Sequence, residues 1–281
     1  MKVLVTGATG GLGELVVNDL LARGVTVIAT SRDAQKAKAS SFYEKVIYRP
    51  YEIGSRSVVG LYSYFEHPDA CIHLAWEKLN EYRNEAHLTS ILEGHKAFIS
   101  GLLKQGLKDF TGIGTCYEYG LREGMLEESL PSEPVMPYPQ AKNLLREYLE
   151  GEKSKYDFSF KWVRLFYIFG AVKERKNLYT LIVEAVKKGD RSFNMSGGEQ
   201  VRDFLTPEQM ADRIVRIALQ KNVEGIINCC SGVPVKLRDF VHDFLKKNKF
   251  GITLNLGFYP YADYEPMESW GSVKKLNSIL K

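Results

Sequence analysis

Short apolar runs alternate with amphipathic stretches over the first two thirds of the chain. The apolar runs read, in chain order, KVLVTG, VTVIATS, EKVIYRP, ACIHLAW, KDFTGIGT and SFKWVRLFYIFG. The stretches between them, such as LGELVVNDLLARG, repeat apolar residues at helical spacing, and this one ends on Arg23 and Gly24, a common helix stop. Strands that alternate with helices predict a parallel sheet with helices on both faces and right-handed crossovers. The expected fold class is therefore α/β, with a doubly wound parallel sheet.

The alternation weakens after Gly170. Residues 171–202 contain one amphipathic helix, NLYTLIVEAVKKGD, followed by a glycine turn. Residues 206–231 return to a helix and a strand, TPEQMADRIVRIALQ and GIINCCS. We therefore expect a main sheet domain over residues 1–170, which segment 206–231 rejoins, and a smaller part formed mainly by residues 171–281.

Composition narrows the classes of protein that fit. Of the 281 residues, 44% are hydrophobic and 26% charged, and no apolar run approaches the ~18 residues of a membrane span. The chain begins directly with a strand and shows no secretory pattern, so we expect a soluble cytoplasmic protein with no membrane partner. The net charge of +4 comes from scattered Lys and Arg. This distribution does not predict a nucleic-acid partner, although it suits a small polyanionic ligand.

The cysteine pattern predicts no metal site and no disulfide. The four cysteines show no C-x-x-C spacing, and two of them are adjacent. We expect reduced thiols, at least partly buried. The cysteines are Cys71, Cys116, Cys229 and Cys230.

A glycine-rich turn follows the first strand. The segment VTGATGGLG reads G-x-x-G-x-x-G between that strand and the first amphipathic helix. Glycines there let the backbone approach a pyrophosphate, whose charge is stabilised at the helix N-terminus. An ordinary tight turn also uses glycine, but the position between strand and helix predicts a dinucleotide site of the Rossmann type. The residues expected to hold it are Gly7, Gly10, Gly11, Leu12 and Gly13.

The end of the second strand indicates which dinucleotide binds. An acidic residue there would bind the adenosine ribose of NAD, whereas an arginine accommodates the 2′-phosphate of NADP. The strand VTVIAT is followed by Ser31 and Arg32, a hydroxyl and a guanidinium that suit phosphate. The sequence therefore favours NADP(H). Asp33 comes next, and since strand ends are uncertain by a few residues, NAD(H) is the alternative.

One tyrosine is followed by a lysine at helical spacing. Of the 16 tyrosines only Tyr138, in MPYPQAKN, has a lysine four positions later, Lys142. On a helix the two side chains share a face, and the ammonium would lower the pKa of the phenol from its usual value near 10. Thr115 ends an upstream apolar strand and offers a hydroxyl to a carbonyl oxygen. These three residues form a candidate acid/base site, the alternative being an exposed pair on a helix surface.

These motifs resemble the extended short-chain dehydrogenase/reductase family that acts on nucleotide-linked sugars. The resemblance runs from Val3 to about Gly232 and includes CIHLAW, GTCYEYG, YPQAK, VRLFYIFG and GGEQVRDFL. It implies that Tyr138 is the acid/base, that Lys142 also holds the nicotinamide ribose, and that Thr115 orients the carbonyl. It further implies a dinucleotide-binding domain over residues 1–170, a substrate-binding part after it, and a homodimer.

The resemblance also implies roles for residues outside this catalytic group. Ala75 and Phe166 would lie along the cofactor, and Arg202, in VRDF, would bind the diphosphate of the sugar nucleotide. An exposed loop arginine is the alternative for Arg202. The aromatic and acidic run YPYADYEPMESW contributes Glu265, either to the substrate or to a packed loop. The residues expected to contact the substrate are Thr115, Cys116, Tyr117, Tyr138, Arg202 and Glu265.

The chain departs from the family pattern at three positions. Trp76 stands where a second alanine is usual and is expected to narrow the site. Tyr167 stands where an asparagine is common. Ile91 or a neighbour replaces an asparagine of the helix before the catalytic strand, so some cofactor contacts do not carry over.

The residues after Thr115 bear on the reaction. Sugar-nucleotide 4,6-dehydratases have Asp-Glu there, whereas this chain has Cys116 and Tyr117, so dehydration is not expected. Fucose-forming epimerase-reductases place a cysteine two positions after the hydroxyl, while Cys116 is one position after and should point to the other side of the strand. Oxidoreduction at one carbon remains, or 4-epimerisation in which a hydride is removed and returned while the sugar rotates.

Ser31 and Arg32 favour a reductase, because an epimerase retains its cofactor and normally uses NAD. The motifs HLAWE, FNMSGGEQVRDFL and LNLGFYPYADYEPMESWGS are similar to those of bacterial reductases of dTDP-4-dehydro-6-deoxyhexoses. We therefore expect NADPH-dependent reduction of the 4-keto group of a nucleotide-linked 6-deoxyhexose, for surface polysaccharide such as lipopolysaccharide O-antigen. A 4-epimerase with bound NAD is the alternative. A non-catalytic NADP-binding regulatory protein is the alternative of another class, disfavoured by the presence of both Tyr138 and Lys142.

Overall fold

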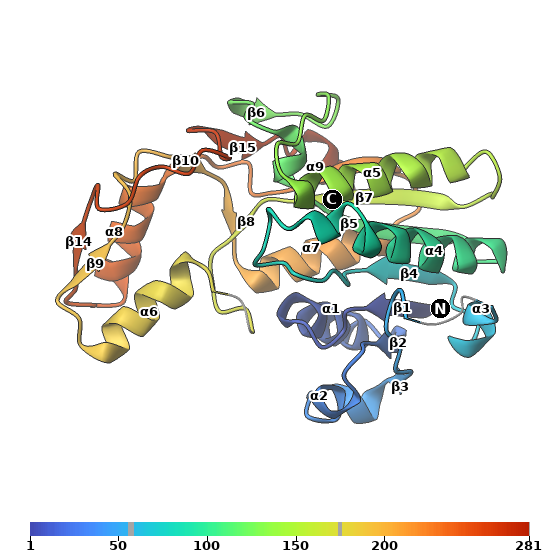
Figure 1. Ribbon diagram of the computed structural model, residues 1–281. Coiled ribbons are helices and arrows are strands. Elements are labelled where there is room, and N and C mark those ends of the chain that lie inside the picture. Colours follow the sequence, from blue (N-terminus) through green and yellow to red (C-terminus); the bar gives the residue numbers. More distant parts are fainter. Residues whose placement is uncertain (56–58, 174–175, 281) are drawn as a thin grey trace.

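A seven-stranded parallel sheet forms the centre of the molecule (Figure 1). The computed structural model describes residues 1–55, 59–173 and 176–280. The strands run in the order β12-β7-β5-β4-β1-β2-β3. This order confirms the predicted doubly wound sheet, and each apolar run identified in the sequence contributes one strand. The strands are β1 (Lys2–Thr6), β2 (Thr26–Thr30), β3 (Ile47–Tyr48), β4 (Ala70–His73), β5 (Asp109–Thr115), β7 (Ser159–Leu165) and β12 (Gly225–Cys229).

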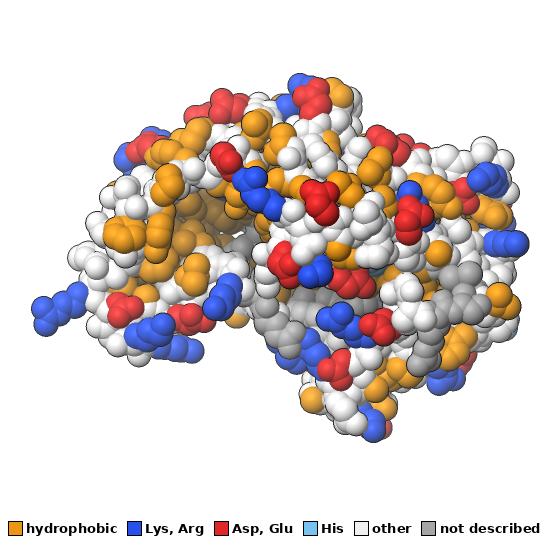
Figure 2. Space-filling model, in the orientation of Figure 1, with side chains coloured by type: hydrophobic (Ala, Val, Ile, Leu, Met, Phe, Trp, Pro, Cys, Tyr) orange, Lys and Arg blue, Asp and Glu red, His pale blue; other side chains and the backbone are white. Residues whose placement is uncertain are grey.

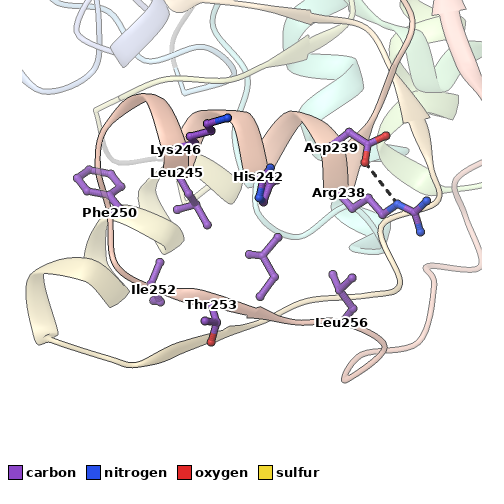
Figure 3. Close-up of a pocket in the computed structure, with 10 residues that line it drawn as sticks. Arg238, Asp239, His242, Leu245, Lys246, Phe250, Ile252, Thr253 and Leu256 are labelled. Carbon is purple, nitrogen blue, oxygen red and sulfur yellow. Dashed lines mark ion pairs between the residues drawn. The ribbon is translucent and has the colours of Figure 1, made fainter.

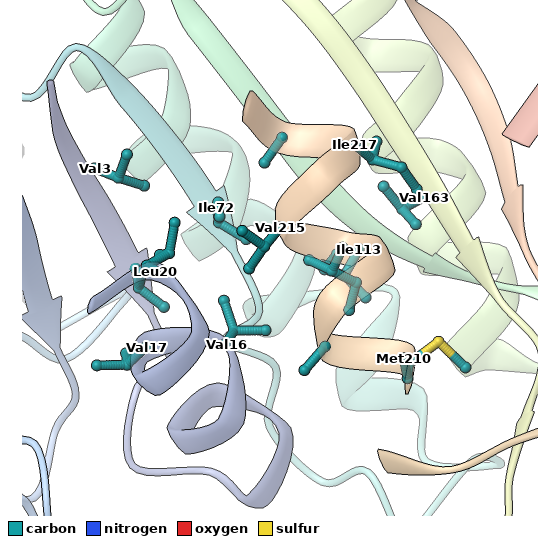
Figure 4. Packing of buried hydrophobic residues seen from close by; sticks show 14 of the residues in the cluster. Val3, Val16, Val17, Leu20, Ile72, Ile113, Val163, Met210, Val215 and Ile217 are labelled. Carbon is teal, nitrogen blue, oxygen red and sulfur yellow. The ribbon is translucent and has the colours of Figure 1, made fainter. Parts of the chain in front are cut away.

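Helices cover both faces of the sheet because alternate strand residues point to opposite sides. Val3 and Val5 of β1 belong to a core shared with α1 (Gly11–Ala22), α7 (Pro207–Leu219) and α9 (Lys274–Leu280). Figure 4 shows side chains of α1 and α7 meeting in this core. Leu4 points the other way, into a second core under α4 and α5. The helices outside the first core and within the main body are α2 (Ala34–Lys38), α3 (Leu61–Tyr64), α4 (Ser90–Lys104) and α5 (Pro137–Glu152).

A smaller part lies beside the main sheet, on the left in Figure 1. It contains α6 (Leu178–Lys188) and α8 (Leu237–Lys247), and its own core includes Phe169, Ile182 and Val241. Four short strand pairs complete the fold outside the central sheet: β9 (Ser192–Asn194) with β14 (Thr253–Asn255), β8 (Tyr167–Ile168) with β11 (Phe204–Leu205), β10 (Val201–Arg202) with β13 (Val235–Lys236), and β6 (Gly124–Leu126) with β15 (Ser269–Gly271).

The chain passes between the two parts more than once. It leaves the main body after β7, returns for α7 and β12, leaves again for α8, and ends with α9 packed against α7 and β12. The dinucleotide-binding and substrate-binding roles assigned to residues 1–170 and 171–281 stay predictions. Because both parts are made from several segments, one cleft can receive side chains from distant places in the sequence.

Within the described ranges, no helix is long and apolar enough to cross a membrane. The same residues contain no group of three or more His, Cys, Asp or Glu side chains that could hold a metal ion. The four cysteines are unpaired and buried, and burial raises the pKa of each thiol.

A buried ion pair joins β7 to the turn that follows β5. Glu118, in the short 3-10 turn Cys116–Tyr119, and Arg164 of β7 are both completely buried, with 2.8 Å between Oε2 and Nε. The Trp162 indole N–H donates to both Glu118 oxygens at 3.1 and 3.0 Å. The backbone N–H of Thr115 donates to Oε1 at 2.9 Å. The carboxylate is thus well supplied with donors, and the turn is held against the sheet.

Removing the cation of this pair should destabilise the fold strongly. We expect Arg164→Leu to lower the free energy of unfolding by about 3–5 kcal/mol, because Glu118 would stay buried without a counter-charge. The double variant Glu118→Gln/Arg164→Leu should recover part of that loss, since a neutral amide costs less to bury. Urea unfolding measures both values.

The matched control is Arg216→Leu, which breaks an exposed pair with Asp212 on α7. It should cost no more than about 1 kcal/mol. If the double variant is as unstable as Arg164→Leu alone, the uncompensated charge of Glu118 is not the cause of the lost stability.

Candidate active site

The carboxyl ends of the sheet strands face the smaller part across a hollow. Figure 2 shows this hollow between the two parts, with hydrophobic side chains on its walls. The strand order reverses direction between β1 and β4, and open parallel sheets bind ligands at the carboxyl edge of such a switch point. The predicted site residues are located below relative to this edge.

The glycine turn after β1 is too closely packed for side chains. Gly7 has φ +67°, and a Cβ there would lie 2.8 Å from the backbone nitrogen of Ala75. At Gly13 a Cβ would lie 2.1 Å from the Gly7 carbonyl oxygen. Gly10 is the N-cap of α1 and supplies no side-chain cap to the first N–H groups of this 12-residue helix. Open N–H groups at a helix start, reached through a turn without side chains, fit the pyrophosphate of a dinucleotide.

Gly11 and Leu12 complete the turn in different ways. A Cβ on Gly11 would lie 2.6 Å from the backbone nitrogen of Lys173, so this glycine allows the loop after β8 to approach the turn. The Leu12 side chain packs against the core under α1, which leaves its backbone N–H as the group that can face a ligand. Ala75 adjoins Gly7 and donates its N–H to the Thr6 hydroxyl at 3.2 Å. The predicted cofactor residues of β1, α1 and β4 therefore meet at one point.

The three residues after β2 have different environments. Ser31 is buried and its hydroxyl is already 3.0 Å from the Tyr48 hydroxyl. The Asp33 carboxylate caps α2 by accepting the Lys36 backbone N–H at 2.9 Å. The Arg32 side chain is exposed. Asp33 is exposed as well, so both the Arg32 guanidinium and the second oxygen of the Asp33 carboxylate are accessible to a ligand.

Tyr138 and Lys142 lie in the first turns of α5, and both are buried. Pro137 begins this helix, in a position where proline is favoured. Tyr138 is 8% exposed and Lys142 is 2% exposed, so the alternative of a solvent-exposed pair is wrong. The Tyr138 ring stacks on Tyr82 with 5.1 Å between ring centroids, and its backbone N–H donates to the Tyr82 carbonyl at 3.0 Å. The helix α5, which carries this pair, packs against β5 and against the turn that follows Thr115.

The Lys142 ammonium is held in an apolar setting. Its Nζ lies 3.9 Å from the centroid of the Trp76 ring. Burial lowers the pKa of Lys142 to about 7, while the charges of Glu118 and Glu77 act in the opposite direction. Lys142 can therefore change its protonation state near neutral pH, whereas a solvated lysine stays protonated there.

Thr115 is the last residue of β5 and the N-cap of the next turn. Its Oγ1 accepts the Tyr117 backbone N–H at 3.3 Å, which leaves the hydroxyl hydrogen to donate elsewhere. The strand ends here, so Cys116 does not alternate with Thr115 along a strand as expected; it begins the 3-10 turn. It is buried in a cluster that also includes Phe166, and burial raises the pKa of the Cys116 thiol to about 12. Phe166 is 4% exposed, and its role beside a cofactor stays a prediction.

Three predicted substrate residues form one hydrogen-bonded network. The Glu265 carboxylate accepts from the Arg202 guanidinium at 2.7 Å and from the Tyr117 hydroxyl at 2.6 Å. Arg202 is 3% exposed, so the alternative of an exposed loop arginine is wrong. Its guanidinium also lies 5.1 Å from the centroid of the Tyr167 ring. The C-terminal aromatic and acidic run thus reaches the turn that follows Thr115.

Sequence reasoning missed Tyr82, and it included Tyr264 only as a member of the run YPYADYEPMESW. The Tyr82 ring centroid lies 5.1 Å from that of Tyr138 and 5.8 Å from that of Tyr117, so Tyr82 adjoins both the buried pair and the network around Glu265. Tyr264 lies 6.4 Å from Tyr117. Segment 77–89 lacks helical or strand periodicity, so nothing in the sequence marked Tyr82. A pocket of about 450 Å³ adjoins these rings and is lined by Asn80, Glu81, Tyr82, Arg83, Asn84, Met136 and Tyr264.

Another pocket of about 460 Å³ lies between α8 and β14 (Figure 3). Apolar side chains such as Leu245 and Ile252 line it, with His242 and Lys246 nearer its rim. None of the predicted site residues lines this pocket. It is therefore distinct from the candidate active site.

Two curated relatives resemble the chain at the sequence level. It is 28% identical to dTDP-6-deoxy-L-talose 4-dehydrogenase (NAD(+)) of Aggregatibacter actinomycetemcomitans, over 97% of this chain and 100% of that protein. It is 24% identical to UDP-glucose 4-epimerase of Streptococcus mutans, over 75% of this chain and 70% of that protein.

A similar solved structure is UDP-glucuronic acid 4-epimerase of Bacillus cereus in complex with UDP-glucuronic acid and NAD. The TM-score is 0.85 at 19% identity, covering 100% of this chain and 93% of that one. This likeness supports the fold. Residues 3–230 match the NAD dependent epimerase/dehydratase family. The chain belongs to this family, which confirms its resemblance to the extended short-chain dehydrogenase/reductases.

Proposed function

We propose that this protein is an oxidoreductase that uses a nicotinamide dinucleotide and acts at carbon 4 of a nucleotide-linked 6-deoxyhexose. The observation that carries the proposal is the burial of Tyr138 and Lys142 on α5, the helix that packs against β5 and the turn after Thr115. A buried phenol beside a lysine that titrates near neutral pH is suited to acid/base work on a sugar hydroxyl or ketone. It also argues against a non-catalytic binding protein, which has no need to bury such a pair.

The full-length similarity to a 4-dehydrogenase supports the choice of carbon 4. A 4-dehydrogenase running backwards is a 4-ketoreductase, because catalysts accelerate both directions of one reaction. The reduction expected from the sequence and the activity in that relative's name are therefore the same chemistry. The direction in the cell depends on the supply of substrate and cofactor.

A 4-epimerase is the second candidate. Two UDP-glucose 4-epimerases are among the sequence relatives, matched over smaller shares of their length than the 4-dehydrogenase. Epimerisation needs the same acid/base pair, together with enough space in the site for the 4-keto sugar to rotate. Incubation with dTDP-linked and UDP-linked sugars distinguishes the two, since an oxidoreductase changes the absorbance at 340 nm in proportion to product and an epimerase does not.

The protein's own residues would act on the oxygen at carbon 4. The chemistry that a bound dinucleotide supplies is hydride transfer to or from that carbon. In the direction of reduction, the Tyr138 hydroxyl donates its proton to the oxygen as the hydride arrives, and in oxidation the phenolate accepts it. The Thr115 hydroxyl would donate a hydrogen bond to the same oxygen, since it accepts the Tyr117 N–H and its own hydrogen is available to donate. The Lys142 ammonium favours the phenolate form of Tyr138.

The form of the dinucleotide depends on the residues after β2. The exposed guanidinium of Arg32 supports NADP(H), as expected from the sequence. The names of the similar proteins specify NAD instead. The capping role of the Asp33 carboxylate is compatible with both, because one of its oxygens faces the helix.

Removal of the phenolic hydroxyl should abolish turnover. We expect Tyr138→Phe to lower kcat by about 10²–10⁴-fold, because the proton donor is lost while the ring still packs on Tyr82. Affinity for the reduced dinucleotide, followed by its fluorescence, should stay within about threefold. The control is Tyr148→Phe on the same helix, where the hydroxyl bonds to Ser100. Turnover retained by Tyr138→Phe would end the proposal.

Removal of the Arg32 guanidinium tests the form of the cofactor. We expect Arg32→Ala to lower kcat/KM for NADPH by about tenfold and to leave that for NADH within about twofold, because only NADPH carries a 2′-phosphate. Steady-state rates with both dinucleotides measure the effect. Equal losses, or a clear preference of the unaltered enzyme for NADH, would show that NAD(H) is the cofactor.

The buried Lys142 should reduce stability at neutral and acidic pH. Its pKa is about 7 in the folded protein and near 10.4 in the unfolded chain, so the unfolded state binds more protons between these values. Stability from this residue therefore rises with pH across that window. Lys142→Met should be more stable than the unaltered, cofactor-free protein by on the order of 2 kcal/mol at pH 6, and the difference should shrink by pH 10. Urea unfolding at the two pH values measures it, and a less stable variant at pH 6 would contradict it.

A further inference from the structure

We infer that Trp76 is a positioning residue that holds the Lys142 ammonium beside Tyr138 through a cation–π contact. This role rests on the proposed function in that Lys142 is taken to assist Tyr138. The contact itself is open to a test that needs no turnover. Trp76 stands at a position where the family pattern has a small residue, and the contacts of its indole give a reason for tryptophan there.

The face of an indole lies close to the Lys142 ammonium. Nζ of Lys142 lies 3.9 Å from the centroid of the Trp76 ring, well inside the ~6 Å limit of such contacts. In the described part of the chain no carboxylate forms an ion pair with this ammonium, and Glu118 and Glu77 act on it from a greater distance. Tryptophan is the strongest of the aromatic partners for a cation, and the contact gains strength when both groups are shielded from water. Trp76 is 8% exposed and Lys142 is 2% exposed.

The indole plane is fixed by a hydrogen bond at its edge. The Trp76 ring N–H donates to Nδ1 of His87 at 3.1 Å. Since Nδ1 accepts, Nε2 of the neutral His87 carries the proton and can donate to the Glu81 carbonyl, 3.1 Å away. Burial lowers the pKa of His87, which favours this neutral form.

A second contact fixes the indole through its ring face. Trp76 stacks on His95 of α4, with 4.4 Å between centroids and 14° between planes. His95 is completely buried and lies 3.0 Å from a Glu77 oxygen and 2.7 Å from Nε2 of His73. The indole is thus wedged between a rigid polar cluster and the lysine.

The same indole touches the other member of the pair. The Tyr138 and Trp76 rings form a T-shaped contact, with 6.2 Å between centroids and 70° between planes. Trp76 therefore contacts both residues of the acid/base pair from the end of β4, while the pair itself belongs to α5. A side chain placed in this way sets the distance between α5 and the strand end, and a small residue would leave the ammonium free to move.

A double-mutant cycle on the cofactor-free protein tests the contact. The cycle compares Trp76→Leu, Lys142→Met and the double variant by urea unfolding at pH 6 and pH 9.5. A cation–π contact exists only when the lysine is charged, so we expect a coupling of about tenfold in the unfolding equilibrium constant at pH 6 and less than about twofold at pH 9.5. Equal coupling at both pH values would show that Trp76 acts by packing alone and would overturn the inference.

Trp76→Phe provides a variant that keeps an aromatic face and a similar fold. Because Phe keeps most of the cation–π contact, the cycle built on Trp76→Phe should show less than half of the pH-dependent coupling that the cycle built on Trp76→Leu shows. The matched control is Trp270→Leu, at a half-buried position of β15. A cycle that combines it with Lys142→Met should show no coupling at either pH. Phe and Leu variants with the same coupling would also overturn the inference.

In the active enzyme the contact predicts a shift of the pH profile. In Trp76→Leu the loss of the indole face makes the charged form of Lys142 less favourable. The pH at which kcat falls on the alkaline side should therefore be about one unit lower than in the unaltered enzyme. An unchanged limb would argue against a positioning role. If the cycle shows the coupling but no nucleotide sugar is turned over, the proposed function fails and the contact stands. If turnover is found without the coupling, the inference about Trp76 fails and the proposed function stands.

Discussion

The completely buried carboxylate of Glu118 is the constraint on which the rest of the site depends. It is bonded to the Arg164 guanidinium, the Trp162 indole and the backbone N–H of Thr115. Because a buried charge is tolerated only when paired and well supplied with donors, the turn after β5 has little freedom to move. Thr115 is thereby fixed at the strand end. The same negative charge favours the ammonium of Lys142.

Two opposing effects act on the charge of Lys142. Burial disfavours its charge, while Glu118 and the face of Trp76 favour it, and the outcome is a lysine that titrates near neutral pH. A group of this kind is poised for proton exchange but costs stability, a compromise expected at catalytic positions. Tyr138, on the same helix, is also buried, and the acid/base pair that we propose depends on this shielding, which a helix surface in water would not provide.

The cleft also explains why the protein needs a second part. Glu265, near the C-terminus, accepts hydrogen bonds from Arg202 of β10 and from Tyr117, in the turn after β5. A substrate held between Thr115 and Arg202 would therefore contact the main body and the smaller part together. Such a span would fit a sugar at one end and a diphosphate at the other, the role that the family resemblance implies for Arg202. The crossings of the chain between the two parts make this arrangement possible.

The sequence by itself determined the parts of this protein that depend on neighbours along the chain. Seven apolar runs became seven strands because buried parallel strands need continuous apolar residues, and the glycine turn and the spacing of Tyr138 and Lys142 follow from strand and helix geometry. Only the tertiary structure decided the burial of that pair, the ring of Tyr82 against it and the indole beneath the lysine. These contacts join residues far apart in the chain, and their packing follows from the fold rather than from any local pattern.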